Sequence, residues 1–230
     1  MEKQEKYRKK YKEINPKWED SGEIFRKMVL EKVDKDTRIL DVGCGHSNLL
    51  QESYEKTPHT YGIDPETDVI HRNPFIKDIR TEFVEKMSFE DNFFDVVVSA
   101  WVLEHLANPH EAFSEIYRVL KPGGVVIFLT PNVWNYNVWL IRLIPERFHS
   151  FFTKKLYGRQ DNDTFPKEYK INSLGKIRKV FSSIGFEEEE LLTNGDPSYI
   201  SFNTFTFKIA SFFEKIRSEE RRVGKECRSR

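Results

Sequence analysis

The chain has 230 residues, of which 38% are hydrophobic and 32% are charged, so it can bury a sizeable core and is not a disordered protein. Its formal net charge of zero gives no reason to expect nucleic acid as an obligatory partner. The N-terminus has no apolar signal segment, no apolar run approaches the roughly 20 residues that span a bilayer, and two cysteines make no disulfide framework. We therefore expect a cytoplasmic protein, and the sequence leaves its oligomeric state open.

The first 36 residues are predicted to form an amphipathic helical extension. Aromatic and aliphatic residues recur there at helical spacing from Tyr7 to Val33, with a break at Pro16. The rest of the natural chain, residues 37–216, is expected to form one domain.

Strands and helices then alternate. Four short apolar segments have the composition of buried parallel strands: 37–42, 60–64, 95–100 and 125–130. Helices are expected over 47–56, which Pro58 ends, and over 109–120, where Pro109 stands in the first turn. The segment "KPGG" is expected to turn the chain before the last of these strands. This alternation predicts a doubly wound α/β fold around a parallel sheet.

After Pro131 the pattern changes. Residues 131–170 are rich in aromatic residues without a clean period, and we interpret them as a lid or substrate insertion. Residues 171–186 predict an amphipathic helix that Gly185 stops, and two final strands are expected over 187–193 and 198–207.

The last fourteen residues, 217–230, match the in-frame translation of a widely used sequencing adapter at every codon. We interpret this segment as an artefact tail and expect the natural sequence to be interrupted near Ile216. The alternative is a charged, solvated tail.

The segment "DVGCG", residues 41–45, joins the first apolar strand to the first helix of the domain. Glycine in such a turn lets a ligand approach the backbone, and the helix N-terminus offers free N–H groups to a carboxylate or phosphate. Asp64 ends the second strand, where an acidic side chain can bind both ribose hydroxyls of an adenosine. Asn48 stands where the dinucleotide fingerprint needs its third glycine. These residues alone leave NAD and S-adenosylmethionine both open.

Three further motifs separate the two cofactors. Together with "DVGCG", they resemble, in order and spacing, the class I S-adenosylmethionine-dependent methyltransferases: "FFDVVVSAWVLEH" at 93–105, "EIYRVLKPGG" at 115–124 and "TPN" at 130–132. The chain looks closest to a broad bacterial group of methyltransferases of types 11 and 23. The resemblance implies a Rossmann-like, seven-stranded sheet, mostly parallel with an antiparallel last strand, and helices on both faces.

The resemblance also implies where S-adenosylmethionine binds. Asp41 and the backbone of Gly43 and Gly45 would hold the methionyl tail, and Asp64 would bind the ribose diol. Phe83 replaces the acid that the family's adenine loop usually carries, so adenine would rest on apolar packing and backbone groups. Further cofactor contacts are expected at Cys44, Pro65, Val84, Met87, Ala100 and Trp101.

Methyl transfer to a hydroxyl needs alignment of the reactants and removal of one proton. "LEH" places Glu104 and His105 just past the strand 95–100, and His105 is the candidate base, with packing or orientation as its alternative role. Some quinone O-methyltransferases with a similar step bind a divalent metal through an upstream acid. That position is Trp101 here, so no metal is expected.

The acceptor would be a small molecule or a glycan, methylated on oxygen. The candidate acceptor contacts are Asn132, His149, Arg159 and Tyr169. Residues 165–173 resemble a segment of methyltransferases encoded among surface-polysaccharide genes, which suggests a sugar or glycan-lipid hydroxyl. Residues 137–156 mix apolar and basic side chains, which is compatible with peripheral membrane contact, although we prefer a lid helix. An NAD(P)-dependent oxidoreductase and a catalytically inactive cofactor-binding protein remain the alternatives.

Overall fold

The computed structural model describes residues 2–46, 48–67, 73–133, 168–201, 203–220 and 226–228. The chain divides into two compact units. The larger unit comprises residues 22–131, 167–192 and 223–230, and the smaller one comprises 1–21, 132–166 and 193–222. This division does not coincide with the boundary expected at residue 36, and the domain boundaries stay a prediction.

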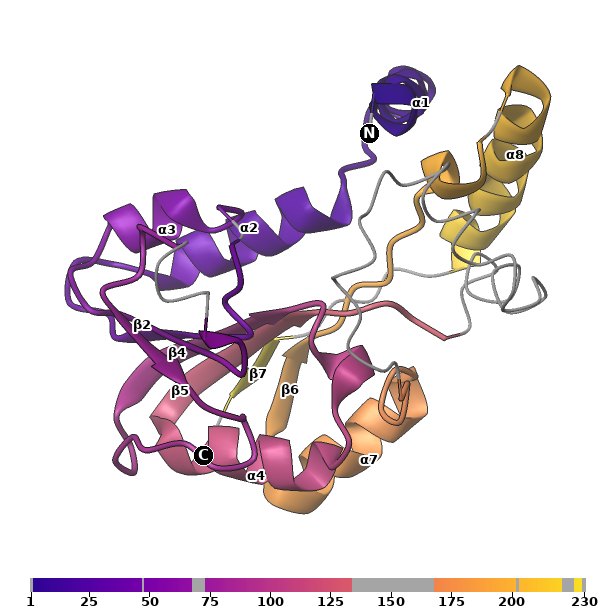
Figure 1. Cartoon of the computed structure of the whole chain (residues 1–230). Coiled ribbons are helices and arrows are strands. Elements are labelled where there is room, and N and C mark those ends of the chain that lie inside the picture. The colour runs from indigo at the N-terminus through magenta and orange to yellow at the C-terminus, as the bar shows by residue number, and fades with distance from the viewer. Residues whose placement is uncertain are drawn as a thin grey trace. The chain divides into compact units, whose positions relative to one another are not determined.

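Five parallel strands form the centre of the larger unit (Figure 1). They are β1 (Ile39–Val42), β2 (Thr60–Asp64), β3 (Asp78–Thr81), β4 (Phe94–Ala100) and β5 (Leu120–Leu129), and they lie in the order β3-β2-β1-β4-β5. The chain runs outward from β1 to β3 and then returns to the other side of β1 as β4, so the strand order reverses between β1 and β4. This is the doubly wound, mostly parallel sheet that the alternating pattern predicted.

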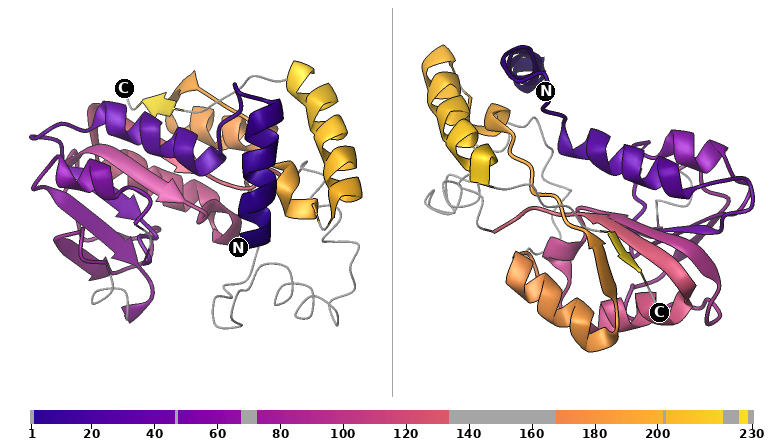
Figure 2. Two further views of the ribbon diagram at one scale, coloured as in Figure 1. Left: turned by 90° about the horizontal axis from the view of Figure 1, so that it is seen from above. Right: turned by 180° about the vertical axis from the view of Figure 1, so that it is seen from behind.

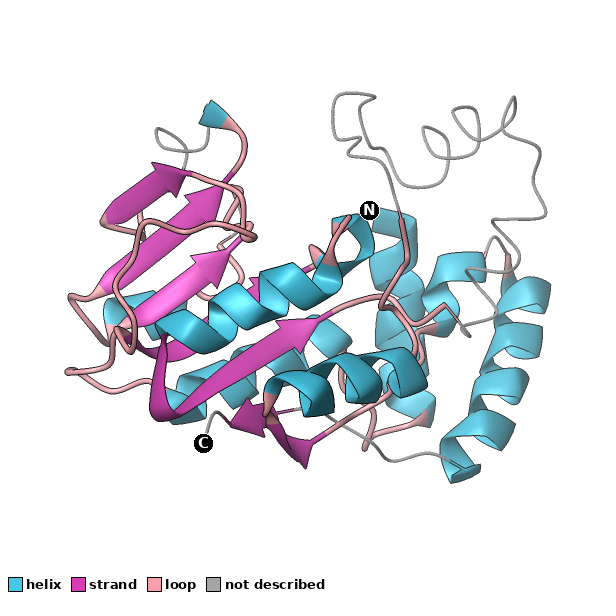
Figure 3. Cartoon of the chain, turned by 90° about the horizontal axis from the view of Figure 1, so that it is seen from below, coloured by secondary structure: helices cyan, strands magenta, loops and turns pink. Residues whose placement is uncertain are grey.

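Helices cover both faces of this sheet (Figures 1 and 2). On one face lie α2 (Ser21–Lys32) and α3 (Gln51–Glu55), and on the other lie α4 (Pro109–Val119) and α7 (Leu174–Ile184). The strands and their flanking helices can be followed by colour in Figure 3.

Successive residues of a strand point to opposite faces, and this alternation divides the core into two layers. Ile39 of β1 packs with Phe25 of α2, whereas its neighbour Leu40 belongs to the layer that contains Phe113 of α4 and Phe181 of α7. The rings of Phe113 and Phe181 lie 4.4 Å apart between centroids.

Three elements of the larger unit differ from expectation. β3 was not expected, because its segment "DIRT" is polar and stands at the edge of the sheet. α3 is shorter than the helix predicted over 47–56. β5 includes the "KPGG" segment that was expected as a turn. The β4–β5 register shifts there, since Phe94 pairs with Leu120 and Val96 with Val125. The extra residues bulge out of the ladder, and Gly123 has a φ of +79°.

The smaller unit contains α1 (Glu2–Ile14), η3 (Pro197–Ile200) and α8 (Thr204–Glu220). The break between α1 and α2 falls around Pro16, as predicted. Tyr7 of α1 stacks on Phe207 of α8 with 5.1 Å between the ring centroids. Arg8 pairs with Asp196 at 2.7 Å.

The strand predicted over 198–207 is wrong, because this segment forms η3 and the start of α8. Asn203 and Thr206 cap the helix reciprocally: the Asn203 side chain accepts from the Thr206 N–H at 2.9 Å, and the Thr206 hydroxyl accepts from the Asn203 N–H at 3.1 Å. Phe207 and Ala210 are then buried at helical spacing. Capping and burial outweigh the alternation of β-formers that suggested a strand.

β6 (Glu187–Glu190) lies within the segment predicted as the first of the two final strands. β7 (Glu226–Arg228) lies between β5 and β6 and is antiparallel to both. β7 belongs to the tail that matches a sequencing adapter, so its pairing does not test whether the natural protein has an antiparallel last strand. The seven-stranded count therefore stays a prediction. None of the helices in the described part of the chain combines the length and apolar character needed to cross a bilayer.

Candidate active site

The carboxyl ends of parallel strands share one edge of a sheet, and several predicted site residues gather at that edge. Residues 43–45 follow β1, Asp64 ends β2, and η2 (Leu103–His105) comes shortly after β4. In open α/β sheets, ligands bind outside this edge at the point where the strand order reverses. That point lies between β1 and β4 here.

The turn after β1 is fixed by hydrogen bonds to the end of β2. The N–H groups of Gly43 and Cys44 donate to the Ile63 carbonyl oxygen at 2.8 and 3.2 Å. The Gly45 N–H donates to Oδ2 of Asp64 at 3.1 Å. Gly43 and Gly45 have φ angles of +72° and +43°, a left-handed conformation that glycine adopts without a Cβ penalty.

The two glycines differ in what surrounds them. A Cβ atom built on Gly43 would lie 2.3 Å from Cγ2 of Val102, so the turn packs directly against the segment that follows β4. Among the residues that the structure describes, a Cβ on Gly45 would meet only the Gly43 carbonyl oxygen, at 3.9 Å. Space beside the Gly45 backbone is therefore left for a ligand.

Asp41 is a buried carboxyl group with one strong hydrogen bond. Its side chain is on the face of α3, where the Tyr54 hydroxyl donates to Oδ2 at 2.5 Å. Burial raises the pKa of Asp41 to about 7; the Tyr54 hydrogen bond opposes this rise and the charge of Asp64 adds to it. A cation placed nearby would favour the ionised carboxylate, so this group fits the ammonium of an amino-acid tail.

Asp64 is also buried, but main-chain groups hold its carboxylate. Oδ2 accepts from Gly45, as above, and Oδ1 accepts from the Glu66 N–H at 2.9 Å. Because a carboxylate offers about four lone-pair sites, two further hydroxyl groups can still bind. The main chain orients Asp64 and leaves it acceptor capacity.

Four other expected cofactor residues lie at the same edge. Cys44 is buried, and burial raises the pKa of its thiol. Pro65 directly follows β2, and Ala100 ends β4; both are half-buried. Trp101 is 47% exposed and has a φ of +58°, which is uncommon for a non-glycine residue and recurs at functional sites.

Val84 and Met87, expected beside adenine, are 7% and 5% exposed and belong to the core layer under α4. Phe83, in the same loop, is 68% exposed. The contact of this loop with a base stays a prediction.

Glu104 lies in a polar cluster at the ends of β4 and β5. It is 4% exposed, and the Thr130 hydroxyl donates to its Oε2 at 3.3 Å. The Asn172 amide donates in turn to the Thr130 oxygen at 2.5 Å. The main-chain N–H groups of Glu168 and Tyr169 donate to the Glu104 carbonyl oxygen at 2.8 and 3.0 Å. The structure thus brings Tyr169, an expected acceptor contact, next to η2.

The remaining candidates are placed as follows. His105 is half-buried at the end of η2, and its main-chain N–H donates to the Val102 carbonyl oxygen at 2.8 Å. Asn132 is half-buried and belongs to the smaller unit. His149 and Arg159 lie outside the described residues. Among the residues that the structure describes, no group of three His, Cys, Asp or Glu side chains could hold a metal ion.

Sequence reasoning missed three supporting residues. Tyr54 binds Asp41, Asn172 binds Thr130, and Asn73 donates from its side chain to the carbonyl oxygens of Cys44 and Gly45 at 3.3 and 3.5 Å. No motif marks them, because each acts on a segment that is distant in the sequence.

Known proteins resemble this chain in both sequence and fold. A family described as "Methyltransferase domain" matches residues 40–128. The demethylmenaquinone methyltransferase of Listeria welshimeri is 27% identical over 216 residues, which cover 80% of this chain and 89% of that protein. The ubiquinone biosynthesis O-methyltransferase of Maricaulis maris is 33% identical over 110 residues, 44% of this chain and 43% of that protein.

The crystal structure of an S-adenosylmethionine-dependent methyltransferase from Mesorhizobium loti aligns with a TM-score of 0.55 at 17% identity, covering 88% of this chain and 95% of that one. This likeness concerns the fold. Together with the family match over β1 to β5 and the glycine turn at the strand-order reversal, it leads to one conclusion: residues 40–128 form a methyltransferase domain, and the chain resembles the class I S-adenosylmethionine-dependent methyltransferases in sequence and fold.

Proposed function

We propose that this protein transfers a methyl group from S-adenosylmethionine to a hydroxyl oxygen of a small-molecule or glycan acceptor in the cytoplasm. The observation that carries the proposal is the meeting of the Gly43–Gly45 turn, Asp64 and η2 at the carboxyl edge of one parallel sheet. The family resemblance supplies the cofactor class.

The residues present fit this cofactor. Space beside Gly45 admits a methionyl tail along the turn, and the buried carboxyl of Asp41 suits its ammonium group. Asp64, oriented by two main-chain N–H groups, would accept hydrogen bonds from both ribose hydroxyls. Cys44, Pro65, Ala100 and Trp101 would line the cofactor at the ends of β1, β2 and β4.

The bound cofactor supplies an electrophilic methyl group, so the protein has to align the acceptor and remove its proton. His105 is the proposed base, because η2 holds it just beyond β4 at the edge that carries the cofactor residues. Glu104 is anchored on both its side chain and its carbonyl, which fixes the backbone next to His105. Hydroxyl acceptors need such a base, whereas an acceptor of low pKa would not.

For the acceptor, the relatives favour a small molecule. One is named for demethylmenaquinone, and the other for ubiquinone biosynthesis and for methylation at oxygen. Tyr169 and Asn132 are proposed acceptor contacts, and we retain His149 and Arg159 in the same role. A glycan acceptor and contact with a membrane surface remain part of the proposal, argued from the composition of residues 131–170.

Ligand-induced stabilisation tests which cofactor the chain binds and distinguishes a methyltransferase from a dehydrogenase. S-adenosylhomocysteine at 100 times its dissociation constant should raise the free energy of unfolding by about 2.7 kcal/mol, whereas NAD should have no effect. Asp64→Ala should lose this stabilisation, and Asp36→Ala, which changes an exposed carboxylate, should keep it. Stabilisation by NAD alone would reject the proposal.

Turnover on a panel of hydroxylated acceptors tests catalysis. His105→Ala should lose far more turnover than affinity for S-adenosylhomocysteine, because the base acts on the acceptor. Equal turnover of the variant would remove His105 as the base. A chain that binds the cofactor and methylates no acceptor would support an inactive binding protein.

A further inference from the structure

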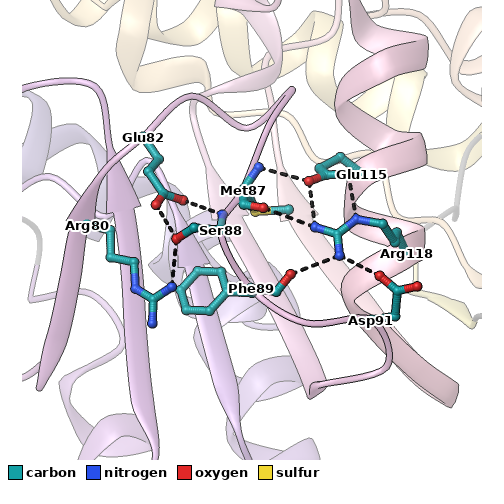
Figure 4. A network of polar contacts seen from close by, with 8 residues as sticks. All are labelled: Arg80, Glu82, Met87, Ser88, Phe89, Asp91, Glu115 and Arg118. Carbon is teal, nitrogen blue, oxygen red and sulfur yellow. Dashed lines mark hydrogen bonds and ion pairs between the residues drawn. The ribbon is translucent and has the colours of Figure 1, made fainter.

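The loop between β3 and β4 leaves the sheet beside the proposed ribose site. β3 ends at Thr81, which lies opposite Asp64 in the parallel register of β2 and β3. The following residues, 82–91, carry the side chains proposed to meet the nucleobase. Figure 4 shows that this loop is held from two sides, by Arg118 of α4 and by Arg80 of β3.

The α4 side of the loop is held by an arginine–glutamate pair. Arg118 forms two hydrogen bonds to Glu115, at 2.6 and 2.8 Å, and then reaches the main-chain carbonyl oxygens of Met87 at 3.1 Å and Phe89 at 2.8 Å. Glu115 accepts from the Met87 N–H at 2.8 Å. Arg118 also pairs with Asp91 at 2.6 Å. Its guanidinium holds the pKa of Glu115 below the usual value, so the pair stays charged at neutral pH.

The β3 side of the loop is held by a second arginine. Arg80 donates to the Ser88 hydroxyl at 2.7 Å and lies 3.9 Å from the centre of the Phe89 ring. Glu82 accepts from both the N–H and the hydroxyl of Ser88.

These contacts engage several polar main-chain groups of the loop. Both the N–H and the carbonyl of Met87 bind the α4 pair, the Ser88 N–H binds Glu82, and the Lys86 N–H closes a turn onto the Phe83 carbonyl at 3.1 Å. The ring of Phe83 is exposed, whereas Val84 is buried. A base would therefore meet a loop whose conformation is fixed in part by Arg80, Glu115 and Arg118, which lie outside it.

We propose that Arg118 and Glu115 are positioning residues for the nucleobase end of the cofactor, acting through the loop 82–91. The inference rests on the proposed function and on the prediction from the sequence that this loop meets the base. It goes further because it gives a role to two residues of α4 that lie outside the loop: the pair sets the conformation of the loop through its main chain.

The test compares two ligands that differ only in the base. S-adenosylhomocysteine has the adenine, whereas S-ribosylhomocysteine keeps the ribose and the amino-acid tail. Since hydrogen bonds to charged groups contribute about 1.5–3 kcal/mol each, Arg118→Met should weaken S-adenosylhomocysteine binding by about ten-fold or more in calorimetry. The affinity of the Arg118→Met variant for S-ribosylhomocysteine should equal that of the unaltered chain.

A second variant and two matched controls isolate the effect. Glu115→Gln keeps the shape of the side chain but removes its negative charge. This variant should also bind S-adenosylhomocysteine more weakly than the unaltered chain. Asp91→Asn removes only the exposed partner of Arg118, and Arg178→Met breaks a comparable Arg–Glu pair between α7 and β6; both should leave the affinity unchanged. Hydrogen exchange should accelerate at the amides of 86–88 in Arg118→Met and not in β4.

The outcomes separate the two proposals. If the unaltered chain binds no S-adenosylhomocysteine, the proposed function fails and the inference fails with it. If it binds and Arg118→Met binds equally well, or if both ligands weaken by the same factor, only the inference is overturned. Equal affinity of the unaltered chain for the two ligands also overturns it, because the base would then contribute nothing.

Discussion

Asp41 of β1 and Asp64 of β2 lie on neighbouring strands and yet are suited to different tasks. Main-chain N–H groups orient both oxygens of Asp64, which fits recognition of a neutral diol. Asp41 faces a tyrosine hydroxyl in the core and ionises reluctantly, which fits a cationic partner that repays its desolvation. Two identical side chains thus differ through their surroundings.

The raised pKa of Asp41 predicts that stability falls with rising pH. In the unfolded chain this carboxyl titrates near its ordinary value of 3.8, and in the folded chain near about 7. Between these values the folded state holds the proton and the unfolded state does not, so the free energy of unfolding decreases from pH 4 to about pH 7 and is level above. At about 1.4 kcal/mol per pKa unit, the decrease amounts to a few kcal/mol at most.

Asp41→Asn removes this titration and serves as the reference. Urea unfolding at pH 5 and pH 8 should show that the unaltered chain loses more stability than the variant over this interval. Parallel pH profiles for the two chains would contradict the buried, reluctantly ionised state of Asp41.

The local pattern of an apolar strand followed by glycine or an acid predicted Gly43, Gly45 and Asp64 as candidates, and the family resemblance added Asp41. Their roles in cofactor binding stay predictions. The sequence could not identify Tyr54 or Asn73, because their roles come from tertiary contacts with the turn. For the same reason, the apolar character of Val84 and Met87 did not show whether these side chains face the protein core or a ligand.

Among the elements, the pattern of apolar residues worked best where one face of the element is buried. β1, β2, β4 and α4 were predicted within a few residues of their bounds. β3 and β6 stand at sheet edges with polar side chains, so their strand character comes from pairing with a neighbour. The strand predicted over 187–193 contains β6, whereas no strand was predicted at β3. The Asn203–Thr206 cap of α8 is a local pattern that favours a helix, but the alternating β-formers of the same segment favoured a strand and led to the wrong prediction.

The contact between the β1 turn and the segment after β4 predicts a large cost for a side chain at Gly43. Gly43→Ala should lose about 1–2 kcal/mol for its left-handed backbone and about 1–3 kcal/mol more for the clash with Val102. Gly123→Ala is the matched control, because its φ is +79° and no atom of the described part of the chain lies within 4 Å of the added Cβ.

Urea unfolding of the two variants measures the difference. Val102→Ala in the Gly43→Ala background should recover the larger share of the loss, since it removes the methyl group that the new Cβ meets. An equal loss for Gly43→Ala and Gly123→Ala would show that backbone strain alone matters, and that β1 and η2 are not locked together there.

For the whole molecule, the alternating pattern predicted the sheet, while the division into two units could not be read from it. The smaller unit joins segments that are far apart in the chain: the Trp18 indole donates to the Gly195 carbonyl at 2.8 Å, and the Asn194 amide donates to the Glu19 carbonyl at 2.6 Å. Such pairings depend on tertiary contacts between segments that are distant in the sequence. A single sequence carries no signal of this kind.

The C-terminal tail that contains β7 is predicted to be dispensable for cofactor binding. β7 contributes three residues that pair with Val125–Ile127 of β5, while the opposite edge of β5 pairs with β4 at Leu120 and from Val125 to Leu129. Apart from Asn132, every candidate site residue that the structure describes stands on or between β1 to β5, or on the segment 168–172. A chain that ends at Glu220 keeps α8 and should bind S-adenosylhomocysteine within about two-fold of the unaltered affinity, because the loss of a few hydrogen bonds costs no more than about 3 kcal/mol of stability. The control replaces residues 221–230 by a glycine–serine tail of the same length. Loss of cofactor binding in both chains would mean that the paired tail supports the site, and would contradict a site built on the five parallel strands.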